Sequence, residues 1–149
     1  MFRALALSVP VAAALAVAVP AADRHPQHDL AASSHGRTLA ATLGSHCTPT
    51  SGAMLCADRS YPLPTKKRLP VHGRGRIRLE FRVEPEEIDA QLRDRRSRSV
   101  HELTARGKGL VRRIRLPRTL PNGWDRLGVF VTYRRGDADF EVDLRRHRH

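Results

Sequence analysis

The chain has 149 residues, and its formal net charge of +12 comes from 27 Lys and Arg against 15 Asp and Glu. This length has room for one domain with a single modest core, and it excludes a chain of several ordinary domains. Aromatic residues make up 5% of the chain, so aliphatic side chains must supply most of the buried area. A balance this basic attracts polyanions, although a surplus of Arg, Ala and Leu is also what a GC-rich genome produces.

Residues 1–22 have the layout of a secretory signal peptide. A lone basic residue, Arg3, precedes an apolar stretch that ends in small residues before the polar Asp23. The apolar stretch is shorter than the roughly 20 residues that a membrane helix needs, and it contains Pro10, so cleavage is favoured over an uncleaved anchor. The predicted product is a secreted protein, extracellular or held in the cell envelope, with no membrane span after cleavage.

The two cysteines stand close together after a polar segment. Residues 23–46 are small and polar with no sustained hydrophobic period, which predicts a flexible spacer. The predicted domain therefore covers residues 47–144, and a basic tail at 145–149 follows. In an oxidising compartment, Cys47 and Cys56 are expected to form a disulfide.

Period-2 alternation predicts the first strands of this domain. Apolar residues alternate with charged ones from Arg76 to Val83, and with polar or charged ones over residues 88–93. The second stretch has a helical alternative over residues 85–106, because Pro85 followed by two glutamates is good helix-start chemistry. A helix would place arginines of the "RDRR" segment on its apolar stripe, so a strand is favoured.

Further short strands are predicted downstream, at residues 100–105, 110–116, 127–133 and 140–144. Turn signals separate them at close spacing, and no convincing helix lies between them. The pattern predicts an all-β protein, an antiparallel sandwich of about six or seven strands.

Residues 113–144, "RIRLPRTLPNGWDRLGVFVTYRRGDADFEVDL", resemble the closing strands of immunoglobulin-like sandwiches in small secreted bacterial proteins. In that pattern a strand ends at Leu-Pro, a turn of the type LPNG follows, and the last two strands form a hairpin. The resemblance implies an immunoglobulin-like β-sandwich, and it carries over no binding or catalytic residue. It departs from antibody-type domains because Cys47 and Cys56 precede the first clear strand and cannot span the two sheets.

Arginines gather on one side of two predicted strands. If the apolar residues point inward, the arginines between and beside them point outward. Were the two strands neighbours, their guanidinium groups would form a ladder suited to phosphate or sulfate, with affinity falling as salt rises. The alternative is a solvated face neutralised by Glu80, Asp139, Glu141 and Asp143. The predicted polyanion-binding residues are Arg74, Arg76, Arg78, Arg82, Arg113 and Arg115.

Catalytic and metal sites are not expected. His46, His72 and His101 have no Gly-x-Ser-x-Gly elbow beside them, and a structural zinc site would need more ligands than the two cysteines and His46 supply. Histidines also occur near both ends of the chain, at His25, His28, His147 and His149. Signal cleavage after Ala22 would make His25 third in the chain, an arrangement that binds Cu(II) or Ni(II), but Pro20 disfavours that cut.

We therefore expect a non-catalytic binding or cell-envelope module that contacts an anionic cell-wall polymer or acidic glycan, needs no cofactor and is a monomer. The single tryptophan, Trp124, lies off the arginine strands, so sequence-specific nucleic-acid binding is not expected. The alternative is a secreted structural protein that meets a specific partner protein through a sheet edge or the turn at 134–137. That turn contains the adhesion tripeptide Arg135-Gly136-Asp137, which composition produces readily by chance and which we interpret as a hairpin turn.

Overall fold

The computed structural model describes Gln27, residues 29–60, Leu63, and residues 67–72, 74–94, 99–118, 120 and 124–146. One set of strands comprises β1 (Leu30–Ser34), β2 (Arg37–Ala40), β6 (Arg76–Phe81), β9 (Ala105–Arg106) and β10 (Val111–Arg115). The other set comprises β3 (Thr42–Pro49), β4 (Met54–Ala57), β5 (Arg68–Val71), β7 (Glu87–Asp94), β8 (Val100–Leu103), β11 (Trp124–Thr132) and β12 (Asp137–Arg146).

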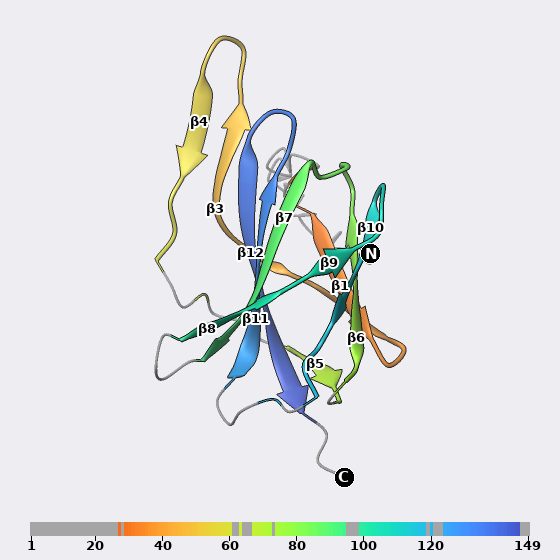
Figure 1. Ribbon diagram of the computed structural model, residues 1–149. Helices are drawn as coiled ribbons and strands as arrows, with labels where there is room; N and C mark the ends of the chain where they lie inside the picture. Colours follow the sequence, from red (N-terminus) through yellow and green to blue (C-terminus); the bar gives the residue numbers. More distant parts are fainter. Residues whose placement is uncertain are drawn as a thin grey trace, which may run out of the picture.

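The two sets form two sheets that pack against each other as a sandwich (Figure 1). The five-stranded sheet has the order β2-β1-β6-β10-β9, and the seven-stranded sheet has the order β4-β3-β12-β11-β7-β8, with β5 beside β12. Pairing is antiparallel apart from the parallel pair β5 and β12. The predicted all-β antiparallel sandwich is confirmed, with twelve strands in place of the six or seven expected.

Alternation of side chains builds the core between the sheets. On β6, Ile77 and Leu79 are fully buried while the arginines beside them are exposed. On β11, Leu127, Val129 and Val131 are fully buried from the opposite side. Aliphatic side chains thus supply most of the core, as the low aromatic content implied.

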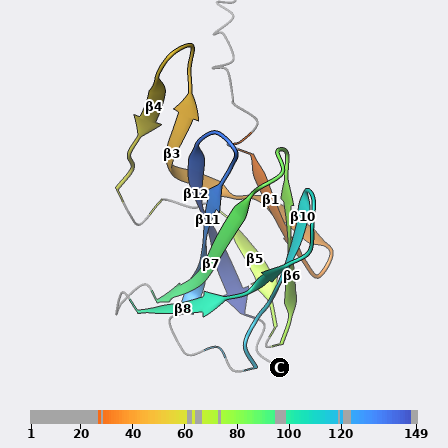
Figure 2. The ribbon, with the colours of Figure 1, turned by 45° about the horizontal axis from the view of Figure 1, so that its top comes forward.

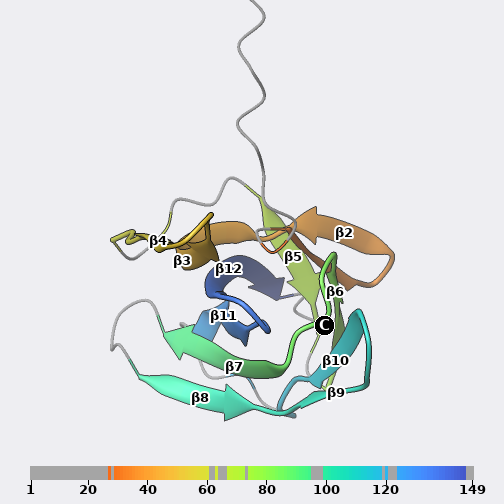
Figure 3. The same ribbon diagram turned by 90° about the horizontal axis from the view of Figure 1, so that it is seen from above.

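The helical alternative for residues 85–106 is wrong, because β7, β8 and β9 lie there. The strand predicted over residues 100–105 is divided, however. β8 pairs with β7 in the seven-stranded sheet, and after Thr104 the chain enters β9, which pairs with β10 in the five-stranded sheet. Seen from above, β8 leads directly into β9 along one side of the sandwich (Figure 3).

The flexible spacer predicted over residues 23–46 differs from the structure from Leu30 onward. β1 pairs with both β2 and β6, and Leu30 and Ala32 are buried in the core. The domain therefore begins before Cys47. The strand escaped notice because its outward positions hold Ala31 and Ser33, so small residues alternate with small residues and the period-2 contrast is weak.

The predicted disulfide is confirmed. Cys47 on β3 lies directly opposite Cys56 on β4, and the two are bonded. The β3–β4 hairpin projects beyond the rest of the sandwich (Figure 2), and every residue of β4 is exposed. The disulfide thus ties the end of this projecting hairpin.

The Arg135-Gly136-Asp137 segment closes the hairpin between β11 and β12, as interpreted from the sequence. The Tyr133 amide donates to the Gly136 carbonyl at 3.0 Å. Gly136 has a φ of +95°, and a Cβ atom there would stand 2.2 Å from the Cys47 carbonyl oxygen. Only glycine fits this turn, since both the backbone conformation and the neighbouring strand exclude a side chain.

Candidate anion-binding face

The two arginine-bearing strands are neighbours in the five-stranded sheet. In the β6–β10 register, Arg113 lies directly opposite Arg78, and Arg115 lies directly opposite Arg76. All four side chains are exposed, while Ile77 and its partner Ile114 are fully buried beneath them. Neighbouring strands stand about 4.8 Å apart, so the arginines form two rows across the sheet, the arrangement expected if the two strands were neighbours.

A further arginine, which the sequence analysis missed, extends one row. Arg106 on β9 lies directly opposite Arg113, so Arg78, Arg113 and Arg106 follow one another across three strands. The sequence contains a turn signal that could have predicted this position, because the "GKG" segment at 107–109 turns the chain back from β9 into β10. We call the outward side of this sheet at Arg76, Arg78, Arg106, Arg113 and Arg115 the arginine face.

The positive charge on the arginine face is little neutralised. Glu80 pairs with Arg78 at 3.1 Å, and both side chains are about half exposed, which screens the pair. Across the described ranges, no carboxylate lies within ion-pair distance of Arg76, Arg113, Arg115 or Arg106. Like charges directly opposite one another across strands destabilise a sheet, so this arrangement carries a cost to folding.

The other two predicted site residues lie at the margins of this face. Arg74 is exposed in the turn before β6, with a φ of 59°, and its amide donates to the Pro117 carbonyl. Arg82 follows β6 and pairs with Asp29 at 3.6 Å, with its own side chain 73% exposed. Neither belongs to the rows.

Beside the arginine face, strands β1 and β2 of the same sheet carry small side chains on their outward side. Ser33 lies opposite Arg78, and Thr38 lies opposite Ser33, so one row continues from guanidinium groups onto two hydroxyl groups. Ala31 and Ala40 occupy the next row, in which Ala31 lies opposite Glu80 on β6. Because these small side chains are shorter than arginine, an extended polymer chain could lie across them beside the arginines.

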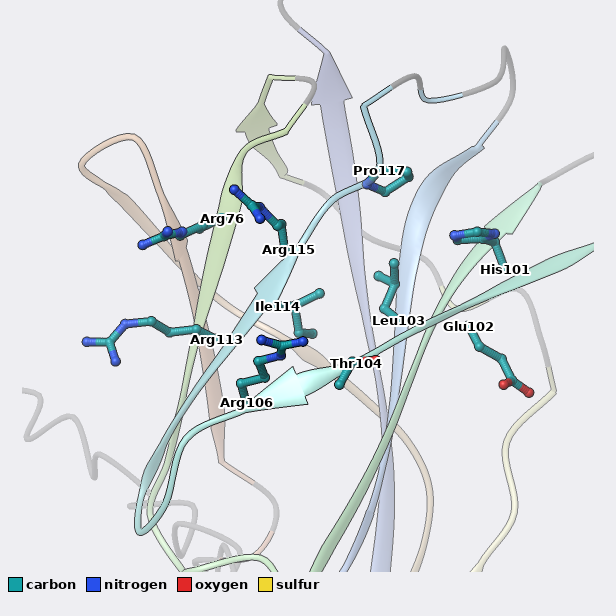
Figure 4. Close-up of a pocket in the computed structure, with 10 residues that line it drawn as sticks. All are labelled: Arg76, His101, Glu102, Leu103, Thr104, Arg106, Arg113, Ile114, Arg115 and Pro117. Atoms are coloured by element: carbon teal, nitrogen blue, oxygen red, sulfur yellow. The ribbon is translucent and has the colours of Figure 1, made fainter.

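A pocket of about 460 Å³ opens where the arginine face meets the β8–β9 crossing. Pockets of about 300–1,000 Å³ commonly hold small ligands. Figure 4 shows arginines from three adjacent strands on one side of it and His101 on the other, while Glu102 points away from the arginines. The pocket is lined by Arg76, Arg106, Arg113, Arg115, His101, Glu102, Leu103, Thr104, Ile114 and Pro117.

The acidic residues proposed to balance this face are, apart from Glu80, in the other sheet. Asp139, Glu141 and Asp143 lie on β12, and the last two are buried. They pair with arginines of the same sheet: Arg126 reaches Glu141 at 2.7 Å and Asp143 at 2.9 Å. The alternative of a face neutralised by these carboxylates is therefore wrong for those three residues.

Glu141 is the centre of this second cluster. It accepts hydrogen bonds from Arg126, from Arg93 at 3.1 Å and from the Leu63 amide at 3.2 Å. Burial raises the pKa of the Glu141 carboxyl, whereas Arg126, the Leu63 amide and Arg93 oppose this rise by stabilising the carboxylate. We call Arg93, Arg126, Glu141 and Asp143 the buried ion cluster.

Other predicted features lie partly outside the described chain. The signal peptide, His25, His28, His147 and His149 are outside the described residues. Within the described ranges, no three His, Cys, Asp or Glu side chains are grouped so that they could hold a metal ion. The described part of the chain contains no helix that is long and apolar enough to cross a membrane.

Comparisons with protein-family models, with curated proteins and with solved structures find no match to this chain.

Proposed function

We propose that this protein is an exported, non-catalytic binding module of the cell envelope or extracellular space, and that its arginine face holds an anionic polymer such as a cell-wall polymer or acidic glycan. One observation carries the proposal. Four exposed arginines on three adjacent strands lie in register on one face, with no carboxylate partner among the described residues. The immunoglobulin-like resemblance fits a small secreted module of this kind.

The in-register arginines are better explained by ligand binding than by a contribution to the stability of the fold. Like-charged residues placed opposite each other weaken a sheet, so a purely structural face would be expected to mix signs. Guanidinium groups are weakly hydrated and offer forked donors, which suits phosphate and sulfate groups better than ammonium groups do. Affinity built in this way depends on the number of contacts and on salt, and little on the sequence of sugars or bases.

The test is retention of the whole protein on an immobilised anionic polymer as salt rises. We expect tight retention at low ionic strength that is lost at moderate ionic strength, with similar behaviour on polymers that differ in sugar or base. Retention that survives high salt unchanged, or is absent at low salt, would contradict the proposal.

A matched pair of double variants separates the face from net charge. Arg113→Gln with Arg115→Gln removes two charges from the arginine face, whereas Arg134→Gln with Arg135→Gln removes two exposed charges from the β11–β12 turn. The first pair should make the slope of log binding constant against log salt concentration less steep by about two, since each lost phosphate or sulfate contact removes about one unit of slope. Equal effects of the two pairs would show attraction by net charge alone.

A second candidate function has one observation in its favour. β4 forms an edge of the seven-stranded sheet, and its Met54 and Leu55 side chains are 53% and 66% exposed. An exposed, uncharged edge strand is a template for pairing with a partner protein. Leu55→Asp should abolish such an interaction and leave polymer retention unchanged, so the two functions give opposite results.

A further inference from the structure

We infer that the pocket beside the arginine face binds the phosphate or sulfate ester group of an organic ligand, and that it selects this tetrahedral group over a carboxylate. We call it the β8–β10 pocket. The inference rests on the proposed function, because four arginines belong both to the arginine face and to the pocket: Arg76, Arg106, Arg113 and Arg115. It goes further by naming the chemical group that is recognised.

The position of the donors favours a tetrahedral group. The arginines that line the pocket stand on β6, β10 and β9, three neighbouring strands, so their long side chains can reach an anion beside Arg106 from different directions. A phosphate or sulfate ester presents three terminal oxygens in three directions, whereas a carboxylate presents two in one plane. Donors that arrive from several strands can satisfy the tetrahedral group more completely.

The side chains spread from one another in the way that repulsion predicts. Figure 4 shows Arg76 and Arg113 extending away from the pocket, while Arg106 leans toward it. All three are exposed, and arginine stems are long and flexible. An anion placed between them would offset their mutual repulsion and draw their guanidinium groups together.

The opposite wall suits the carbon-bearing part of an ester. Leu103 and Pro117, both partly exposed, supply apolar surface, and Thr104 and His101 supply polar groups beside it. A ligand with its anionic group on the arginines would lay its sugar or polyol part along this wall. Pockets that bind organic ligands commonly combine an apolar lining with a few placed polar groups in this way.

Arg106 is the arginine best placed to test the pocket, because it stands on the short β9 strand that follows β8 and its side chain leans toward the pocket (Figure 4). Lys108 offers a matched control. It is exposed, carries the same charge and lies two residues away in the β9–β10 turn, but it does not line the pocket. Arg106→Lys adds a variant that keeps the charge and removes the forked donor.

The experiment titrates the whole protein with three small probes and follows backbone amide signals by NMR. A sulfated monosaccharide and the corresponding uronic acid each carry one negative charge, so they compare tetrahedral with planar geometry at equal charge. Glycerol phosphate is the third probe, and the tighter of the two ester probes identifies phosphate or sulfate as the source. We expect shifts at Leu103, Thr104 and Ile114, with the ester bound at least about fivefold more tightly than the uronate.

Arg106→Gln should weaken ester binding about tenfold, and Arg106→Lys should recover only part of it, because one charge-assisted contact is lost. Lys108→Gln should change the affinity by less than about twofold. Equal affinity for ester and uronate, or equal losses from Arg106→Gln and Lys108→Gln, would overturn the inference. If the esters fail to bind while the polymer is retained, the pocket assignment alone fails; if neither binds, the proposed function fails with it.

Discussion

Both sheets of the sandwich carry arginines on their outward faces, but the two faces treat the charge in opposite ways. On the seven-stranded sheet, Arg126 is 7% exposed and lies between two buried carboxylates. On the five-stranded sheet, Arg113 is exposed and lies between two other arginines. On the seven-stranded sheet the arginine pairs with carboxylates of the same sheet. On the five-stranded sheet the arginine remains exposed to solvent or to a ligand.

The difference separates charges that serve the fold from charges that are free to act outside it. Buried charges are tolerated when they are paired and hydrogen-bonded, as they are around Glu141. Exposed like charges in register bring no such compensation, and their cost to folding is small because water screens it. The two faces should therefore respond differently to the same kind of substitution.

The largest contrast is expected from removing one carboxylate on each face. Glu141→Gln would remove the carboxylate shared by Arg93 and Arg126 and leave them only Asp139 and Asp143, so it should lower the free energy of unfolding by about 3 kcal/mol, the lower end of the range for a broken buried pair. Glu80→Gln removes the exposed partner of Arg78 and should cost less than about 1 kcal/mol. Equilibrium denaturation measures both. Similar losses would show that the buried ion cluster is no more important to stability than a surface pair.

A smaller loss is expected from Gly128→Ala on β11. A Cβ atom at residue 128 would stand 2.8 Å from Cζ of Arg93, whose guanidinium group crosses this position to reach Glu141. Displacing Arg93 should lower the free energy of unfolding by about 1–2 kcal/mol, because a hydrogen bond to a charged group contributes about 1.5–3 kcal/mol and the flexible Arg93 side chain can shift to recover part of it. In an Arg93→Gln background the same substitution should cost almost nothing, and a full loss there would contradict this explanation.

The smallest effect has the opposite sign. Arg113→Gln removes the middle charge of the row formed with Arg78 and Arg106, so it should raise the free energy of unfolding by about 0.2–1 kcal/mol. The gain should shrink at high ionic strength because salt screens the repulsion. The same variant should bind anionic polymer more weakly. Loss of stability at low salt would show that Arg113 serves the fold.

Much of the arginine face could be predicted from the sequence because side-chain direction follows parity along a strand. Alternation placed Arg76 and Arg78 on the side opposite to Ile77, and the structure agrees. The alternation of side chains along a strand does not show which strands are neighbours. The prediction of two arginine rows therefore assumed that these two strands pair, and in the structure β6 does pair with β10. Arg106 was missed because its strand has two residues and no apolar alternation.

The buried ion cluster could not be predicted by the same reasoning. Glu141 and Asp143 alternate with Phe140 and Val142, which is the pattern of a strand whose polar side faces water. Their burial depends on residues far away in sequence, among them Leu63, whose amide reaches Glu141 across a separation of 78 residues. No local pattern records a contact of that kind.

The position of β12 has a consequence for the order of folding. It is the last of the described strands in sequence order, yet it pairs with β3, β5 and β11. Three earlier strands therefore wait for residues 137–146 before their native partner exists, and topologies ruled by such distant pairings fold in roughly milliseconds to seconds. The β3–β4 hairpin is local and can form within about 1–10 μs, which brings Cys47 opposite Cys56 early. Sequence order and sheet order thus differ in this protein: β12 lies between strands that precede it in the chain, while the outlying β3–β4 hairpin can pair before β12 is in place.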